Sequence, residues 1–316
     1  MKIAVTGANG FVGRELLRQA SDAGHTVVPL VRSACGLPGE IVTGNLHESS
    51  LSASDLAGCE AVIHLAARTH VMNDTAEDPM GEYRRTNVDG TKAILELAIG
   101  AGVSRFVFMS SIKAIGERSR PGAPLEPDAA PKPEDAYGKS KLEAEKLVRK
   151  RCEAAPISWV ILRPPLVYGP GVKANFERLV GWIRRGVPLP FGLIENRRSL
   201  VDVRNLADAA LLAATHPDAP GKAFMVADVT LSTPDLARKI GAAVERPARL
   251  ISVPTALLRL AGAIAGKREM IERLCGTLEL DVTRTKAVLG WRPRRSFERS
   301  LSEIDAYSDI SRREKM

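Results

Sequence analysis

The chain opens with Met1-Lys-Ile-Ala-Val-Thr-Gly-Ala-Asn-Gly-Phe-Val-Gly13, the stretch that decides its fold. Residues 2–6 form a short apolar run typical of a buried parallel strand, and apolar residues recur at helical spacing over residues 12–23. Between them, Gly7 lets the chain turn, Gly10 lets backbone N–H groups approach a ligand, and Gly13 lets helix and strand pack closely. A helix N-terminus attracts anions through its unpaired N–H groups and its dipole. The stretch therefore predicts a cradle for the pyrophosphate of a dinucleotide.

Strand and helix patterns alternate through the first half of the chain. Strands are expected at residues 26–31, 41–42, 61–65, 105–109 and 159–162, and helices at residues 12–23, 88–101 and 139–154. This alternation is typical of an α/β fold with a doubly wound parallel sheet. Proline and glycine become frequent after residue 164, which predicts a smaller C-terminal lobe. We therefore expect a Rossmann-type dinucleotide-binding domain over residues 1–164, with returning segments near 198–214 and 223–227, and a second lobe over residues 165–316.

Composition limits the partners and the compartment. The 316 residues carry a formal charge of +8, but Lys and Arg are spread along the chain and only 4% of residues are aromatic, so no nucleic-acid site is expected. No apolar run reaches the roughly 18 residues of a membrane span, and no signal-peptide pattern precedes the first strand. The four cysteines lie far apart, which argues against a disulfide framework or a zinc site. We therefore expect a cytoplasmic protein without a metal centre.

The end of the second expected strand bears on the choice of cofactor. In dinucleotide-binding folds a carboxylate at this place binds the adenosine ribose of NAD, whereas an Arg accommodates the 2′-phosphate of NADP. Here the strand ends without an acid, and Arg32 stands one residue beyond the usual place. Because Arg32 could also be a plain surface residue, the missing acid carries more weight. NADP(H) is therefore favoured, with NAD as the alternative.

Two patterns in the middle of the chain indicate proton-transfer chemistry. Tyr137 and Lys141 form a Y-x-x-x-K pattern, so a helix would place them on one face. The ammonium would favour the phenolate and lower the pKa of the phenol, as an acid or base that accompanies hydride transfer requires. Ser111 follows the strand expected at residues 105–109, at the edge where such sheets bind ligands. Asn87 stands at an expected helix start, where it is either an N-cap or part of the proton relay.

The order of these motifs resembles the extended short-chain dehydrogenase/reductase family of nucleotide-sugar epimerases, dehydratases and reductases. The resemblance covers almost the whole chain, and the matching segments are residues 6–13, 108–116, 137–141, 162–170, 198–203 and 289–293. It implies that Ser111 is the catalytic hydroxyl, that Tyr137 is the acid/base and that Lys141 holds the nicotinamide ribose. It also implies a homodimer, because family members often pair through two helices of each subunit.

The same resemblance implies two sets of ligand contacts. The cofactor would contact Gly7, Asn9, Gly10, Phe11, Val12, Gly13, Arg32, Asn45, Leu46, Leu65, Ala66, Ala67, Asn87, Tyr137, Lys141 and Pro164. A UDP-sugar would contact Ser111, Lys113, Tyr137, Asn175, Phe191 and Arg198. A guanidinium fork suits phosphate oxygens, which agrees with Arg198 on the diphosphate. Arg198 could instead be a surface residue, and Lys113 could instead pair with Glu117.

Departures from the family pattern bear on the reaction. Leu166 stands where epimerases often carry an Asn that faces the sugar. The Ser-Ser-Ile-Lys segment that ends at Lys113, in combination with residues 133–138, 196–200, 273–274 and 280–281, looks most like a bacterial branch that reduces UDP-4-keto-6-deoxy-N-acetylhexosamine for surface polysaccharides. Together with the lack of an acid at the end of the second strand, this resemblance favours an NADPH-dependent 4-ketoreductase. The alternative is an NAD-dependent UDP-hexose 4-epimerase acting on glucose or N-acetylglucosamine. A third reading, of another class, is a non-catalytic NADP-sensing or nucleic-acid-binding module on this fold.

Overall fold

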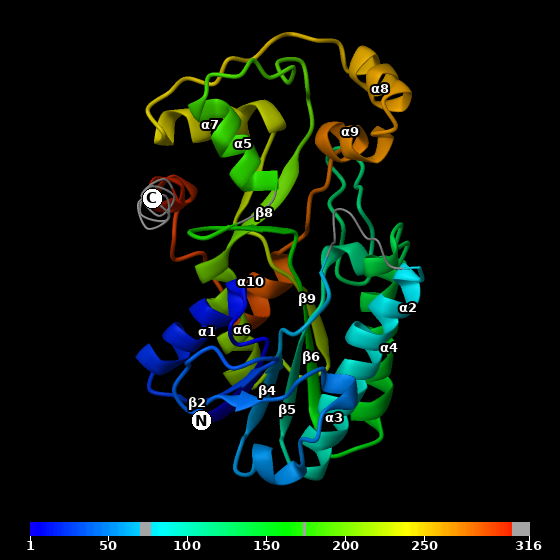
Figure 1. Cartoon of the computed structure of the whole chain (residues 1–316), viewed down its shortest axis with the longest axis vertical. Helices are drawn as coiled ribbons and strands as arrows, with labels where there is room; N and C mark the ends of the chain where they lie inside the picture. Colours follow the sequence, from blue (N-terminus) through cyan, green and yellow to red (C-terminus); the bar gives the residue numbers. More distant parts are fainter. Residues whose placement is uncertain (70–76, 173–174, 305–316) are drawn as a thin grey trace.

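A seven-stranded parallel sheet forms the centre of the computed structural model, which describes residues 1–69, 77–172 and 175–304 (Figure 1). Its strands are β1 (Lys2–Thr6), β2 (Thr26–Val31), β3 (Ile41–Val42), β4 (Ala61–His64), β5 (Arg105–Met109), β6 (Ser158–Arg163) and β9 (Lys222–Met225). Their order is β3-β2-β1-β4-β5-β6-β9, and all neighbouring strands run parallel. The predicted α/β class with a doubly wound, Rossmann-type sheet is confirmed.

Helices cover both faces of this sheet (Figure 1). One side carries α1 (Phe11–Asp22), α6 (Val203–Thr215) and α10 (Thr283–Leu289), and the other carries α2 (Pro79–Arg84), α3 (Gly90–Gly100) and α4 (Ala136–Glu153). Side chains of β1 alternate between the two layers, as strand geometry requires. Ile3 and Val5 belong to the apolar cluster under α1 and α6, whereas Ala4 belongs to the cluster under α3 and α4. Burial on both faces explains why the strands read as nearly continuous apolar runs.

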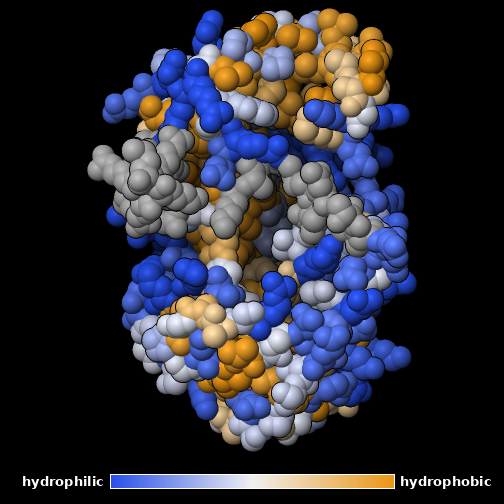
Figure 2. All heavy atoms as spheres, in the orientation of Figure 1, coloured by the Kyte–Doolittle hydropathy of each residue, from blue (hydrophilic) through white to orange (hydrophobic). Residues whose placement is uncertain are grey.

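A smaller lobe covers the carboxyl ends of the sheet (Figure 1). Its three-stranded sheet has the order β10-β8-β7, in which β7 (Leu166–Tyr168) runs parallel and β10 (Val229–Leu231) antiparallel to β8 (Arg198–Asp202). The helices of this lobe are α5 (Asn175–Arg184), α7 (Thr233–Ala243), α8 (Thr255–Ile264) and α9 (Arg268–Cys275). Figure 2 shows that the molecular surface is hollowed between the two lobes.

Segments from the second half of the chain return to the first lobe. Strand β9 pairs with β6 at the edge of the large sheet, and α6 packs against α1. The indole of Trp291 is fully buried beside α6, where its Nε1 donates to the carbonyl oxygen of Asn205 at 3.1 Å. Within the described ranges, no helix is long and apolar enough to cross a membrane.

Two helix starts differ from the sequence-based expectation. Helix α4 begins at Ala136 rather than residue 139, because Asp135 caps it: Asp135 Oδ1 accepts from the backbone N–H of Gly138 at 2.7 Å. Asn87 is not an N-cap. It lies within a π-helical turn, η3 (Arg85–Asp89), that leads directly into α3. π-Helical turns often occur at functional sites.

Candidate active site

The loop between β1 and α1 has the shape that its glycines predict. Gly7 has a φ of +66°, and a Cβ there would lie 2.9 Å from the backbone nitrogen of Ala66, just after β4. A Cβ on Gly13 would lie 2.3 Å from the carbonyl oxygen of Gly7, so α1 rests directly on the loop. Gly10 precedes α1 without a side-chain capping bond, and both Asn9 and Gly10 are exposed. The Gly10 N–H donates to the Gly7 carbonyl oxygen at 2.9 Å, which closes the turn. A tight, exposed turn at the N-terminus of α1 fits a pyrophosphate.

A chain of buried hydrogen bonds fixes the strand ends beneath this loop. Thr6 Oγ1 accepts from two backbone N–H groups just after β4, at 3.1 Å each, and lies 2.6 Å from His64 Nδ1. His64 Nε2 lies 2.9 Å from Thr91 Oγ1, whose hydroxyl donates to the carbonyl oxygen of Asn87. Burial lowers the pKa of His64 to about 3, so the ring is neutral, accepts at Nδ1 and donates from Nε2. Sequence analysis missed His64, although a polar residue ending a buried strand is a usable signal.

Asn87 connects this network to the catalytic helix. Its Nδ2 donates to Ser140 Oγ on α4 at 2.9 Å, and its Oδ1 accepts from the backbone N–H of Arg68 at 2.8 Å. Ser140 Oγ in turn donates to the carbonyl oxygen of Tyr137 at 2.8 Å. Asn87 therefore holds the segment after β4 against the first turns of α4.

The other residues predicted to contact a cofactor differ in their burial. Those that are half-buried are Phe11, Val12, Leu46, Leu65, Ala66 and Ala67, whereas Pro164 is buried at the end of β6. Leu46 lies against Gly90 of α3. Asn45 Nδ2 donates to Glu48 Oε2 at 3.0 Å, so this amide already has a partner within the chain.

The loop after β2 is organised around a carboxylate. Glu40 accepts from the backbone N–H groups of Cys35, Gly36 and Leu37 at 2.9, 3.1 and 2.9 Å, and from the Cys35 thiol at 3.0 Å. The bond from the thiol, together with those from the backbone, lowers the pKa of Glu40 to about 2. Arg32 precedes this loop and is exposed. The end of β2 is therefore followed by an exposed guanidinium.

The structure brings Ser111 and Tyr137 together at the carboxyl edge of the sheet. Ser111 follows β5 and caps the short helix η4 (Ile112–Ala114), while Tyr137 lies half-buried in the first turn of α4. Burial raises the pKa of Tyr137 above its usual value, a hydrogen bond with Ser111 opposes this shift, and the carboxylate of Asp135 adds to it. We expected the pKa of Tyr137 to lie below its usual value because of Lys141. It lies above that value, because the effect of burial is larger than that of the neighbouring groups.

Lys141 lies one helical turn beyond Tyr137 and is 2% exposed. Its Nζ donates to the carbonyl oxygen of Met109 at 2.8 Å and lies 4.6 Å from the centre of the Phe108 ring. Burial lowers the pKa of Lys141 to about 7, against the favourable charge of Glu145. The ammonium thus sits in a dry site at the end of β5.

A buried ion pair behind Lys141 escaped the sequence analysis. Glu145 accepts from Arg163 Nε at 2.8 Å and Nη2 at 2.5 Å, and from Ser110 Oγ at 2.6 Å. Both side chains are at most 3% exposed, and Arg163 also donates to the carbonyl oxygen of Pro127 at 2.6 Å. The usable signal was a Glu four residues after Lys141, on the same helix face.

The residues predicted for a sugar nucleotide lie in both lobes. Arg198 starts β8, and its Nη1 donates to the carbonyl oxygen of Gly276 at 3.0 Å. Burial lowers the pKa of Arg198, Glu117 opposes this shift and Arg273 adds to it. Arg273 Nε lies 3.2 Å from Glu117 Oε2, so two guanidinium groups flank one carboxylate. Phe191 is buried in the apolar cluster of the second lobe.

Three further predicted positions have different outcomes. Asn175 begins α5, but its side chain lies outside the described part of the structure. Lys113 Nζ donates to Asp135 Oδ2 at 2.5 Å and lies 3.2 Å from Glu117 Oε1, so the alternative pairing with Glu117 is present. Leu166 is 50% exposed at the start of β7.

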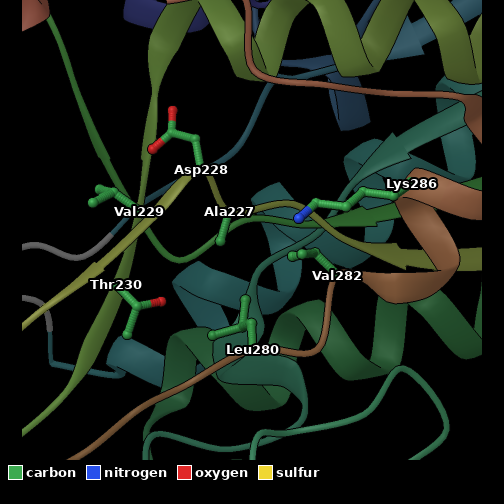
Figure 3. Close-up of a pocket in the computed structure, with 7 residues that line it drawn as sticks. All are labelled: Ala227, Asp228, Val229, Thr230, Leu280, Val282 and Lys286. Atoms are coloured by element: carbon green, nitrogen blue, oxygen red, sulfur yellow. The ribbon is translucent and has the colours of Figure 1, made fainter. Parts of the chain in front are cut away.

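Two cavities of about 150 Å³ each lie near the lobe boundary. Figure 3 shows the first, where the Lys286 amine points toward Ala227 and the Asp228 carboxylate points away from Leu280 and Val282. The second adjoins the start of α4 and is lined by Glu117, Arg118, Glu134, Asp135, Glu269, Glu272 and Arg273. Over the described residues, no group of His, Cys, Asp and Glu side chains could hold a metal ion.

Comparisons with known proteins agree with this arrangement. The family model described as "NAD dependent epimerase/dehydratase family" matches residues 3–227. A UDP-glucose 4-epimerase of Vibrio cholerae is 38% identical over 95% of this chain and 93% of its own length. A 2-alkyl-3-oxoalkanoate reductase of Stenotrophomonas maltophilia is 30% identical over 98% and 99%. The structure of MoeE5 in complex with UDP-glucuronic acid and NAD, 26% identical, superposes with a TM-score of 0.78 over 98% of this chain and 100% of that one. This chain belongs to the NAD-dependent epimerase/dehydratase family and is an enzyme of that family.

Proposed function

We propose that this enzyme is a UDP-hexose 4-epimerase, which inverts the C4 hydroxyl of a UDP-sugar. The observation that carries the proposal is the hydrogen bond between the Ser111 hydroxyl and the Tyr137 phenol at the carboxyl edge of the sheet. The kinship with a UDP-glucose 4-epimerase over nearly the whole chain supports this choice of reaction. MoeE5, solved with a UDP-sugar and NAD, supports the ligand class.

In this proposal the chain moves one proton at the C4 oxygen of the sugar. Tyr137, as the phenolate, takes the proton of the C4 hydroxyl while Ser111 donates a hydrogen bond to the same oxygen. A bound nicotinamide supplies the acceptor and later the donor for the hydride at C4. After the 4-keto sugar has rotated to present its opposite face, Tyr137 returns its proton to the C4 oxygen. Protons and electrons therefore balance over the cycle. Lys141 stabilises the phenolate with its positive charge.

Arg198 and Arg273 are the groups that we assign to the diphosphate. Both lie beside Glu117 at the edge of the second lobe, and Arg273 also reaches Asp135 at 3.7 Å. A diphosphate offers these guanidinium groups more acceptor oxygens than the single carboxylate does. The phenol would then act on the sugar, and the two guanidinium groups would hold the diphosphate that links the sugar to the nucleoside.

A second candidate is the NADPH-dependent reduction of a UDP-4-keto-6-deoxy-N-acetylhexosamine. It is favoured by the end of β2, where the exposed Arg32 directly follows the strand and the Glu40 carboxylate is already bound by the backbone N–H groups of residues 35–37. The exposed Leu166, at the position where epimerases often carry an Asn, favours it as well. We propose NAD as the cofactor of the epimerase and NADPH as that of the reductase.

One experiment separates the two candidates. The purified enzyme is incubated with UDP-glucose without added cofactor, and separately with a UDP-4-keto sugar and NADPH. An epimerase forms UDP-galactose while the absorbance of reduced nicotinamide stays constant, whereas a reductase consumes NADPH in proportion to substrate. Tyr137→Phe must abolish whichever activity is found. If cofactor-loaded enzyme transforms neither sugar, both candidates are wrong.

The homodimer and the cytoplasmic location stay predictions. Light scattering of the purified enzyme would test the first, and fractionation of cells that express it would test the second. Neither outcome would change the assignment of Ser111 and Tyr137.

A further inference from the structure

An ion pair joins the two turns that carry Ser111 and Tyr137. Lys113 lies in η4, two residues after Ser111, and its Nζ donates to Asp135 Oδ2 at 2.5 Å. Asp135 precedes Tyr137 by two residues, and its other oxygen accepts from the backbone N–H of Gly138 at 2.7 Å. One carboxylate therefore receives hydrogen bonds from both turns.

The backbones of these turns are also in direct contact. A Cβ on Gly138 would lie 2.4 Å from the carbonyl oxygen of Lys113. No other residue type fits there without moving η4 away from α4. The ion pair thus adds a contact between side chains to the contact between the two backbones, and both hold the turns together.

The charge of Asp135 matters because of its position next to the phenol. Burial opposes ionisation of Asp135, but the bonds from Lys113 and Gly138 outweigh it, so the pKa of Asp135 lies below its usual value and the carboxylate is charged. This negative charge raises the pKa of Tyr137. A cation on Asp135 therefore shields the phenolate from the nearest carboxylate.

We propose that Lys113 is a positioning residue: through Asp135 it holds the turn of Ser111 against the turn of Tyr137 and neutralises the carboxylate beside the phenol. The inference rests on the proton transfer proposed above. It goes beyond that proposal because it gives Lys113 a role that needs no contact with the substrate.

Other charged or titratable groups lie around the two turns. Glu117, after η4, and Arg273, on α9, pair with Lys113 and Asp135. Tyr83 on α2 packs against the Tyr137 ring, and Lys141 lies one helical turn beyond Tyr137 on α4. Arg273 is the only one of these four that an ion pair joins to Asp135, and at 3.7 Å it is more distant than Lys113. It compensates only part of the charge that loss of Lys113 would expose.

The test compares Lys113→Met, Asp135→Asn and the double variant, with Lys113→Arg as the conservative substitution and the exposed Lys139→Met as control. Asn retains the helix cap, so Asp135→Asn removes mainly the charge. The readout is the ionisation of the Tyr137 phenol, followed by carbon NMR of ring-labelled tyrosine in the cofactor-bound enzyme, with Tyr137→Phe to assign the signal. Because the chain has four tyrosines, the spectrum is simple. This readout needs no substrate, so it remains informative if the proposed reaction is wrong.

We expect Lys113→Met to raise the midpoint of the phenol by about one pH unit, the scale of one neighbouring charge, and Asp135→Asn to lower it. The double variant, Lys113→Arg and Lys139→Met should stay near the wild type. The limb of the turnover profile on which activity rises with pH, as the phenol ionises, should move with the midpoint. Shifts of Lys113→Met and Asp135→Asn in the same direction, or no shift, would overturn the inference. A purely structural role would lower turnover and leave the midpoint unchanged.

Discussion

Replacement of Glu145 by Ala tests how much the catalytic helix depends on its buried ion pair. The substitution leaves Arg163, whose side chain is 3% exposed, with the Pro127 carbonyl oxygen as its remaining acceptor at 2.6 Å. It also removes the acceptor of Ser110. An uncompensated buried charge of this kind costs about 3–5 kcal/mol of the free energy of unfolding. With an m-value of about 3 kcal/mol/M in urea, the unfolding midpoint should fall by about 1.3 M.

Helix α4 offers a matched control two residues earlier. Glu143 also forms a bidentate pair, with Arg84 at 2.7 and 2.9 Å, but these side chains are 36% and 55% exposed. Exposed pairs contribute about 0–1 kcal/mol, so Glu143→Ala should leave the midpoint nearly unchanged. Urea unfolding followed by circular dichroism measures both variants. Equal shifts for Glu145→Ala and Glu143→Ala would refute the argument from burial.

Three other substitutions test separate parts of the site. Gly13→Ala would place a Cβ 2.3 Å from the Gly7 carbonyl oxygen, so we expect a loss of about 1–3 kcal/mol in urea unfolding and weaker cofactor binding by calorimetry. Lys141 has a folded pKa of about 7, below its unfolded value of about 10.4, so the native state binds fewer protons and wild-type stability should rise from pH 7 toward pH 10. Lys141→Met should flatten that rise, stabilise the fold at pH 6 and abolish turnover; an unchanged slope would contradict the shift. Arg32→Glu should weaken binding of NADPH more than binding of NADH in fluorescence titrations. Equal losses of affinity would show that Arg32 does not bind the 2′-phosphate.

The parts of the fold that the sequence predicts well are those encoded by local patterns. The glycines at positions 7, 10 and 13 each meet a steric need within a few residues of themselves. The inner strands β1, β4, β5 and β6 are largely buried on both faces, so each reads as an apolar run. By contrast, β7 and β10 have three residues each, too few to show a period. The sequence pattern misses the first turn of α4 because that turn contains Gly138, which is a poor helix former. The close contact with the Lys113 carbonyl oxygen requires a glycine at this position.

The parts of the site that escaped prediction are pairings between distant residues. Lys113 and Asp135 are 22 positions apart, and Glu145 and Arg163 are 18 apart. Nothing in the local sequence says which acid a given cation will meet, because that depends on how η4, α4 and β6 converge. The motif residues were easier to find, since Tyr137 and Lys141 share one helix and one helical period.

Burial acts on the two central catalytic candidates in opposite directions, and this constrains how they ionise. It raises the pKa of Tyr137 and lowers the pKa of Lys141, so each group alone favours its neutral form. A phenolate and an ammonium one helical turn apart stabilise each other, so the charged forms arise most readily as a pair. The charge of Glu145 opposes the effect of burial on the pKa of Lys141, and Lys113 binds the Asp135 carboxylate whose charge acts on Tyr137. Both ion pairs therefore favour the charged state that proton transfer needs, in a site dry enough for that charge to act strongly on a bound sugar.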